Sequence, residues 1–147
     1  MTGLEQDPCT RVHLWHDLGA VADARRALVH DLEDAGRDRR SIEDAVLVFS
    51  ELAANAVEHG SPHGCGHVEA TWCLYPDGAR ITVAGDVDPV VGEKVQDQFQ
   101  PVVADQYAPR GRGLAIVDHV CDRWGVDVDD GTVRVTAQLA FDPLAED

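Results

Sequence analysis

The chain has 147 residues, of which 44% are hydrophobic, and a formal net charge of −15 at pH 7. This length suits a single domain that buries about two thirds of the surface its unfolded chain exposes. The acidity opposes the phosphate backbone of nucleic acids, so direct DNA or RNA binding is not expected. The apolar runs are far shorter than the roughly 20 residues that a membrane-spanning helix needs, so membrane insertion is not expected either.

The cysteines are spread along the chain and form no Cys-x-x-Cys pair. They are Cys9, Cys65, Cys73 and Cys121, and no apolar leader follows Met1. This pattern indicates reduced thiols in a cytoplasmic protein that needs no disulfide framework. No internal repeat or linker divides the sequence, so residues 1–147 are expected to form one domain.

Two helices are predicted after a short first strand. "RVHLWHD", residues 11–17, alternates apolar and polar side chains, which is typical of a strand. Residues 19–36 have helical spacing and end at Gly36. Ser41, with Asp44 as a capping-box-like partner, is expected to begin a second helix that continues to about Gly60.

The remaining residues favour strands around one long loop. "HVEATWCLY", residues 67–75, and "ARITVAG", residues 79–85, flank "PDG" and predict an antiparallel hairpin. Residues 86–111 have little periodicity, and a loop of this length is usually functional or mobile. Helical spacing resumes over 113–125, and two strands around "DDG" end the chain. The order predicts an α+β fold, a two-layer sandwich in which helices cover one face of a mostly antiparallel mixed sheet.

The predicted helix 41–60 carries one polar stripe. Its main apolar face comprises Ile42, Ala45, Val46, Phe49, Leu52, Ala53, Ala56 and Val57. At about 100° per residue, the polar residues Asp44, Glu51, Asn55 and Glu58 gather roughly opposite that face, flanked by Leu47, Val48 and Ala54. An otherwise apolar helix with one such stripe raises the question of what the stripe faces.

Glu51 and Asn55 lie one helical turn apart and so share a face. An Asn amide oxygen can be the single protein ligand that Mg²⁺ accepts while it binds substrate phosphates. A carboxylate one turn away can orient or deprotonate a hydroxyl that attacks phosphorus. The alternative is a solvated polar stripe on a buried helix.

"AGDVDP" places Asp86 at the end of a predicted strand. A carboxylate there can accept a hydrogen bond from an adenine amino group and would face an oxygen in guanine. The alternative is an ordinary turn, because Asp and Pro both initiate turns.

"RGRGLAIVD" places Gly111 and Gly113 just ahead of a predicted helix. Bare backbone at a helix N-terminus can approach a phosphate, and Arg110 and Arg112 supply local positive charge. The segment is neither the dinucleotide fingerprint nor a P-loop. A flexible loop-to-helix junction is the alternative.

Soft or borderline metal ligands gather near one loop: His59, His63, Cys65 and His67. Their spacings do not match the usual zinc patterns. A plain polar loop and a metal site are the two interpretations.

The order of these motifs resembles that of the Bergerat-fold ATP-binding proteins, also called the GHKL or HATPase_c family. "SELAANAVEHG" is similar to the N box of that family, "ITVAGDVDP" to its first glycine box, and "GRGLAIVDHVCDRWGV" to its second. The resemblance covers roughly residues 15–140 and points to the small anti-sigma-factor serine kinases, such as RsbW and SpoIIAB.

The resemblance implies ATP and Mg²⁺ as cofactors, with Glu51 as the catalytic carboxylate and Asn55 as the Mg²⁺ ligand. It also implies that Asp86 holds adenine, that Thr132 lies near the nucleotide, and that residues 90–110 form a lid. Arg110, Gly111, Arg112 and Gly113 would then close on the phosphates.

The implied activity is that of a serine kinase that sequesters a sigma factor and phosphorylates an anti-anti-sigma antagonist, with homodimerisation as a further implication. Two acidic residues depart from the family pattern: Asp88 stands where Gly or Ser is usual, and Glu58 where Lys or Arg is frequent. Both add negative charge near the expected phosphates. The alternative function is therefore a regulatory module of the same fold that binds its partner with little or no phosphoryl transfer.

Overall fold

The computed structural model describes residues 8–15, 17–59, 68–86, 117, 120–129 and 131–141. The side chains of Glu58, His59, Asp86 and Asp129 lie outside this description. In chain order, the elements of the described part are β1 (Cys9–His13), α1 (Leu18–Asp34), α2 (Arg39–His59), β2 (Val68–Tyr75), β3 (Gly78–Asp86), β4 (Arg123–Asp129) and β5 (Thr132–Ala140).

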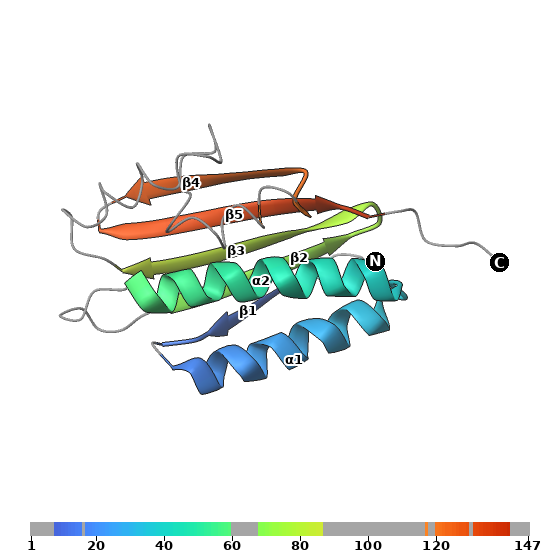
Figure 1. Cartoon of the computed structure of the whole chain (residues 1–147), viewed down its shortest axis with the longest axis horizontal. Helices are drawn as coiled ribbons and strands as arrows, with labels where there is room; N and C mark the ends of the chain where they lie inside the picture. Colours follow the sequence, from blue (N-terminus) through green and yellow to red (C-terminus); the bar gives the residue numbers. More distant parts are fainter. Residues whose placement is uncertain are drawn as a thin grey trace, which may run out of the picture.

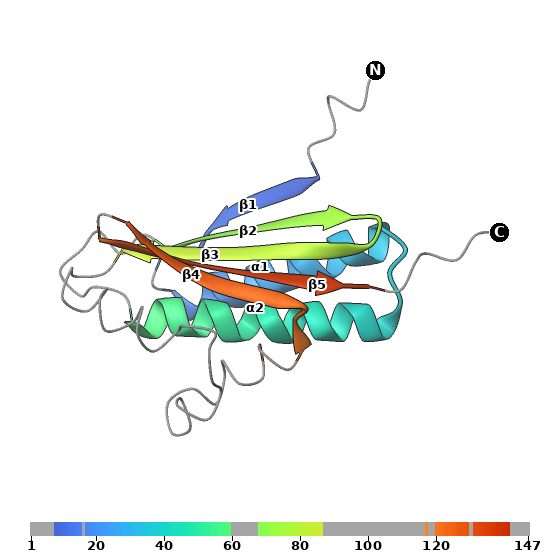
Figure 2. The same ribbon diagram turned by 90° about the horizontal axis from the view of Figure 1, so that it is seen from above.

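The strands form one sheet in the order β1-β2-β3-β5-β4, and each pairing between these described strands is antiparallel. Both helices lie on the same face of the sheet, with α2 packed mainly against β3 and α1 packed beside α2 (Figures 1 and 2). The predicted α+β sandwich is therefore confirmed. The other face of the sheet carries no helix in the described part of the chain.

Helix α1 forms where apolar residues recur at helical spacing, and its buried side chains are Val21, Ala24, Leu28 and Leu32. Asp17 caps its N-terminus by accepting a hydrogen bond from the Gly19 N–H at 2.8 Å. The helix ends before Gly36, which has a φ of 78° in the left-handed region that glycine tolerates. The predicted stop at Gly36 is confirmed.

Helix α2 begins two residues earlier than predicted. The Asp38 carboxylate accepts a hydrogen bond from the Ser41 N–H at 2.9 Å, so Asp38 provides the N-terminal cap. A hydrogen bond with the Ser41 side chain, together with this backbone bond, lowers the pKa of Asp38. Ser41 itself is buried inside the first turn, so its assignment as the cap, with Asp44 as its partner, is wrong.

The core lies between the two helices and the sheet face that they cover. Alternate residues of the strands point into it, including Trp72, Ile81, Val83 and Ala137. Phe49 of α2 meets Trp72 of β2 edge to face, with ring centroids 5.8 Å apart. This packing fixes how α2 is rotated against the sheet.

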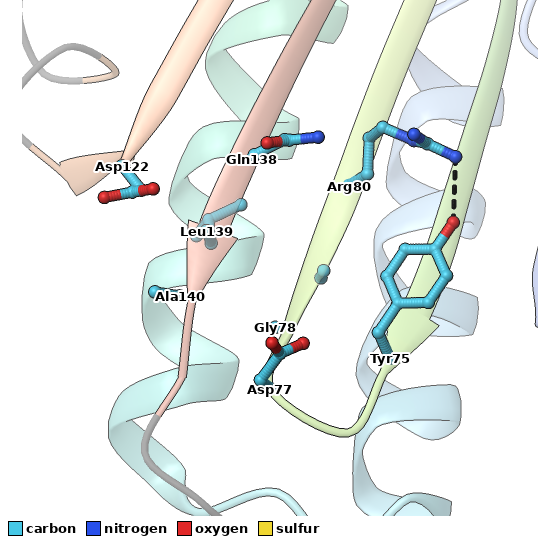
Figure 3. A pocket seen from close by; sticks show the side chains of 9 residues that line it. Tyr75, Asp77, Gly78, Arg80, Asp122, Gln138, Leu139 and Ala140 are labelled. Atoms are coloured by element: carbon cyan, nitrogen blue, oxygen red, sulfur yellow. Dashed lines mark hydrogen bonds between the residues drawn. The ribbon is translucent and has the colours of Figure 1, made fainter.

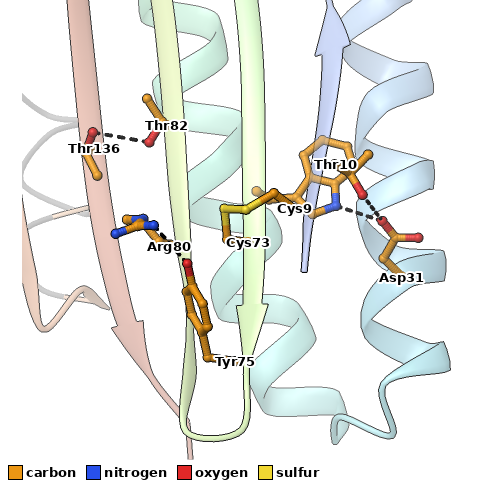
Figure 4. Close-up of a disulfide and its surroundings, with 9 residues drawn as sticks. Cys9, Thr10, Asp31, Cys73, Tyr75, Arg80, Thr82 and Thr136 are labelled. Atoms are coloured by element: carbon orange, nitrogen blue, oxygen red, sulfur yellow. Dashed lines mark hydrogen bonds between the residues drawn. A yellow bond between two sulfur atoms is a disulfide. The ribbon is translucent and has the colours of Figure 1, made fainter. Parts of the chain in front are cut away.

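A disulfide joins Cys9 of β1 to Cys73 of β2 (Figure 4). The two residues lie directly opposite each other in the strand register, with Cα atoms 3.9 Å apart. The neighbouring pair is hydrogen-bonded from Leu74 N–H to Pro8 O, so Cys9 and Cys73 form the closer, non-hydrogen-bonded type of pair. The expectation of reduced thiols is wrong for both residues, because the fold brings together cysteines that are 64 positions apart.

Disulfides are rare in cytoplasmic proteins. The cysteine pattern therefore no longer supports a cytoplasmic location for this protein. Among the described helices, neither is long and apolar enough to cross a membrane. Cys65 lies outside the described residues.

The predicted helix over 113–125 extends too far. Val117 and Val120 are helical, and the Cys121 N–H donates to the Val117 carbonyl oxygen at 2.8 Å. Strand β4 begins at Arg123, so the last three residues of the predicted helix belong to the sheet. Trp124 is buried there against the core as part of this strand.

Candidate functional site

The polar stripe of α2 was expected opposite the buried face of the helix. In the structure, Glu51 and Asn55 of this stripe lie at the border of the core. Glu51 and Asn55 are both half-buried, and Val48, expected to flank the stripe, is completely buried. The reason is that α2 is covered on two sides, by the sheet and by α1. The apolar face deduced from the sequence combined the residues that face the sheet with those that face α1. Its centre therefore lay between the two directions and not towards the sheet.

A single hydrogen bond shows which flank of α2 faces α1. The Arg25 Nε of α1 donates to Ser50 Oγ at 3.0 Å, so Ser50 faces α1. Glu51 follows Ser50 by about 100° around the helix, and Asn55 lies one turn beyond Glu51. Glu51 and Asn55 therefore occupy the flank of α2 that is turned away from α1.

Both polar side chains are available to a ligand as far as the described residues are concerned. Within that part of the chain, neither Glu51 nor Asn55 has an ion pair or a side-chain hydrogen bond. Half-buried polar groups normally have a partner, which can be protein, water or ligand. An amide oxygen and a carboxylate one turn apart form a donor set that suits a hard cation and a hydroxyl.

Asp86 and Thr132 are brought together by the sheet. Asp86 is the last residue of β3 and pairs in register with Thr132, the first residue of β5. The sequence alone did not predict this pairing, because 45 residues separate the two positions. Helix α2 ends at the same end of the sheet as the arrowhead of β3 (Figure 1). The fold thus places the helix with Glu51 and Asn55 and the strand ends with Asp86 and Thr132 at one end of the molecule.

Other predicted site residues lie outside the described residues. These are Arg110, Gly111, Arg112 and Gly113, together with Asp88 and the expected lid over 90–110. His63, Cys65 and His67 also lie outside, and within the described ranges no group of three or more metal-ligating side chains is found. The convergence of the side chains at 51, 55 and 86 on one pocket therefore stays a prediction.

The sequence from residue 14 to residue 139 matches the family model of the histidine kinase-like ATPase domain. The chain belongs to this family. The matched range includes α2, the end of β3, the start of β5, and the segments with the two glycine-box motifs. The histidine kinase-like ATPase assignment thus confirms the resemblance found in the sequence.

The fold of this histidine kinase-like ATPase domain is similar to that of a chain in the crystal structure of the SiaB-SiaC complex from Pseudomonas aeruginosa. The TM-score is 0.76 at 11% sequence identity, over 94% of this chain and 93% of that chain. At this identity the likeness establishes the fold. Among curated proteins, none matches the sequence significantly.

Proposed function

We propose that this protein is an ATP-dependent serine kinase that also acts as an anti-sigma factor. In this proposal it sequesters a sigma factor and phosphorylates a serine of an anti-anti-sigma antagonist. The histidine kinase-like ATPase family and the three motifs in family order support the use of ATP. The observation that carries the proposal is the pair Glu51 and Asn55, half-buried on the flank of α2 that faces away from α1.

Asn55 fits the role of magnesium ligand. Mg²⁺ usually keeps several waters and accepts only one or two protein oxygens beside the substrate phosphates. The Asn55 amide oxygen offers one neutral ligand of that kind, close to the end of α2. Bound Mg·ATP would supply the transferable phosphoryl group, and Asn55 would hold the cation.

Glu51 fits the role of the carboxylate that acts on the serine. One turn before Asn55, its side chain can accept a hydrogen bond from an incoming hydroxyl and take its proton as the oxygen attacks. Partial burial keeps bulk water from competing for that bond. In this proposal Asn55 binds the cation and Glu51 accepts the proton.

Adenine and phosphates are assigned to the remaining site residues. We assign the adenine amino group to Asp86, at the end of β3, and nucleotide contact to its register partner Thr132. Arg110, Gly111, Arg112 and Gly113 are assigned to the phosphates. A chain with a net charge of −15 needs such local compensation before a triphosphate can bind.

The fold is also compatible with a function in partner binding. The similar chain from Pseudomonas aeruginosa comes from a complex of two proteins, SiaB and SiaC. By analogy we assign an antagonist protein and a sigma factor as partners of this chain, and a homodimer as its assembly.

A second function is favoured by two acidic residues. Glu58 and Asp88 lie in the N box and the first glycine box, where their charges would repel phosphates. A protein of this fold that retains partner binding but transfers little or no phosphate is the alternative. The two functions differ in one measurable property, which is phosphate transfer to a partner serine.

Replacement of Asn55 tests the cation site. Asn55→Ala should weaken Mg²⁺-dependent ATP binding at least about tenfold, a loss of about 1.4 kcal/mol, measured by calorimetry with and without Mg²⁺. Asp44→Ala is the matched control, because Asp44 is half-buried on the same stripe but lies near the start of α2. Equal affinity in wild type and Asn55→Ala would remove the magnesium assignment.

Replacement of Glu51 tests the chemistry. Glu51→Ala should bind ATP within about threefold of wild type yet lose at least about a hundredfold in transfer of labelled phosphate to a partner serine. The assay uses the partner retained from a cell lysate in the presence of ATP. A wild-type protein that binds this partner but transfers no phosphate would support the binding-module alternative.

A further inference from the structure

The sheet face opposite the helices, here called the outer face, has an ordered arrangement of side chains. The strand register aligns Arg11, Thr71, Thr82 and Thr136 in one row that crosses four strands. Gly125 of β4 continues the row at its far end. Across this row the outer face therefore carries one arginine, then three threonines, then no side chain.

A groove of about 420 Å³ lies over this row, and the three threonines are part of its lining. Thr82 Oγ1 and Thr136 Oγ1 are 3.2 Å apart, within hydrogen-bonding distance (Figure 4). A Cβ atom added at Gly125 would meet no heavy atom within 4 Å, so the space above the β4 end of the row is open. The groove has a floor of short side chains that carry hydroxyl donors.

Arginines surround this floor on three sides. Arg11 stands at the β1 end of the row, Arg80 one row to one side and Arg134 one row to the other. Arg80 donates a hydrogen bond to the Tyr75 hydroxyl oxygen at 2.8 Å, as Figures 3 and 4 show. The guanidinium groups of Arg11 and Arg134 approach Glu69 and Asp127 only at 3.8 and 3.7 Å.

The charge of the described groove lining has the opposite sign from that of the whole chain. The lining carries the guanidinium groups of Arg11, Arg80 and Arg134 against the carboxylate of Glu69 among the described residues. The whole chain has a net charge of −15. An excess of arginine around one groove of so acidic a protein favours an acidic ligand there.

We propose that this groove binds a carboxylate-rich, extended segment of a partner protein. Guanidinium groups and hydroxyls both donate to carboxylates, and charge-assisted bonds of this kind are the stronger ones. Crossing the groove from β1 to β5 covers three inter-strand spacings, or about 14 Å, which an extended segment of about four to five residues spans. A second copy of the chain fits less well, because two of these grooves placed against each other would bring arginines against arginines.

The test uses a fluorescein-labelled hexaglutamate peptide and fluorescence anisotropy on the full chain without nucleotide. The double variant Arg80→Glu, Arg134→Glu should lose at least about tenfold in affinity for this peptide. The matched control is Arg26→Glu, Arg39→Glu, which makes the same change of charge on exposed arginines of α1 and α2. The control should stay within about twofold of wild type.

Gly125→Phe tests the shape of the groove without a change of charge. Gly125 lies in a strand, where aromatic residues are well tolerated, and the site has free space. We expect an unchanged melting temperature and at least about a fivefold weaker affinity for hexaglutamate.

Three results would overturn the proposal. The first is that the wild type does not bind hexaglutamate. The second is that the Arg26→Glu, Arg39→Glu control loses as much affinity for the peptide as the Arg80→Glu, Arg134→Glu variant. The third is that the molecular mass of the Arg80→Glu, Arg134→Glu variant, measured by light scattering, differs from that of the wild type. The last result would assign the face to a second copy. None of these measurements involves ATP, so they test peptide binding in the groove independently of the proposed kinase activity.

Discussion

At the scale of single residues, Asp31 holds the helical layer to the sheet. One carboxylate oxygen of Asp31 accepts hydrogen bonds from Trp72 Nε1 at 2.8 Å and from Thr10 Oγ1 at 3.0 Å (Figure 4). Its donors belong to β2 and β1, whereas Asp31 belongs to α1. The Trp72 ring is completely buried, so its indole N–H has no water to replace this partner.

Removal of the Asp31 carboxylate should therefore destabilise the fold. Asp31→Ala is expected to lower the free energy of unfolding by about 1.5–3 kcal/mol, measured by urea denaturation. Asp34→Ala is the control, because Asp34 lies on the same helix but is 74% exposed and pairs with the exposed His30, at 3.5 Å. The control should change stability by less than about 0.5 kcal/mol. Equal effects of the two variants would contradict this account.

Arg37 performs a similar task at the turn between β2 and β3. Its guanidinium group donates to the carbonyl oxygens of Tyr75 and Pro76 at 2.7 and 2.6 Å and lies 4.9 Å from the centre of the Phe141 ring. These contacts fix the connection between α1 and α2 against the turn between β2 and β3. A buried arginine is tolerated here because carbonyl oxygens and an aromatic face compensate its charge.

At the scale of elements, α2 combines a local start signal with a long-range orientation. Its C-terminal limit and its Glu51–Asn55 spacing follow from the sequence. Its rotation depends on Phe49 against Trp72 and on Ser50 facing Arg25, which are contacts with residues at least 23 positions away. The N-terminal limit was missed because Asp38, three residues before Ser41, is an equally good cap residue.

The cap of α2 gives a prediction about pH. The pKa of Asp38 is lowered in the folded protein, so the unfolded chain takes up a proton at Asp38 before the folded protein does. The stabilisation by Asp38 should be complete above its unfolded pKa, near about 4, and be lost as pH falls through the lower folded value.

Asp38→Ala should accordingly lower the melting temperature by about 2–4 °C at pH 7, and the difference from wild type should shrink below about pH 4. Asp38→Asn is the control, since Asn also caps helices but does not titrate. A difference between wild type and Asp38→Ala that stayed constant down to pH 2 would contradict the role of the ionised carboxylate.

At the scale of the whole molecule, the disulfide closes the chain from β1 to β2. It joins the outermost strand β1 to its neighbour and encloses both helices, with a sequence separation of 64. In the chain-entropy description, a cross-link over a loop of this length lowers the conformational entropy of the unfolded chain and so raises the free energy of unfolding by about 4 kcal/mol. Strand β1 thus stays at the edge of the sheet through a covalent bond as well as through its hydrogen bonds.

Loss of this bond should be measurable as a loss of stability. Cys73→Ser, or reduction of the wild type, is expected to lower the free energy of unfolding by about 2–4 kcal/mol in urea denaturation. The double variant Cys9→Ser, Cys73→Ser should be as stable as the reduced wild type and should not respond to reductant. A wild type with the same stability in the presence and absence of reductant would contradict the bond.

The sequence by itself determined most of the local elements and the order of the motifs. Helix α1 with its stop at Gly36, the hairpin of β2 and β3, the position of Glu51 and Asn55 on one helix face, and the order of motifs that indicated the family all follow from spacing and turn residues. These features depend on residues close together in the chain, whose periodicity is visible without a fold.

Only the tertiary structure decided how distant residues meet. It paired Asp86 with Thr132, joined Cys9 to Cys73, turned the polar stripe of α2 to the flank away from α1, and aligned the threonines of the outer face. Strand order and register depend on the packing of the whole core, because a shift of one residue would turn every buried side chain to the other face. That choice is made between segments separated by tens of residues, where local spacing carries no information.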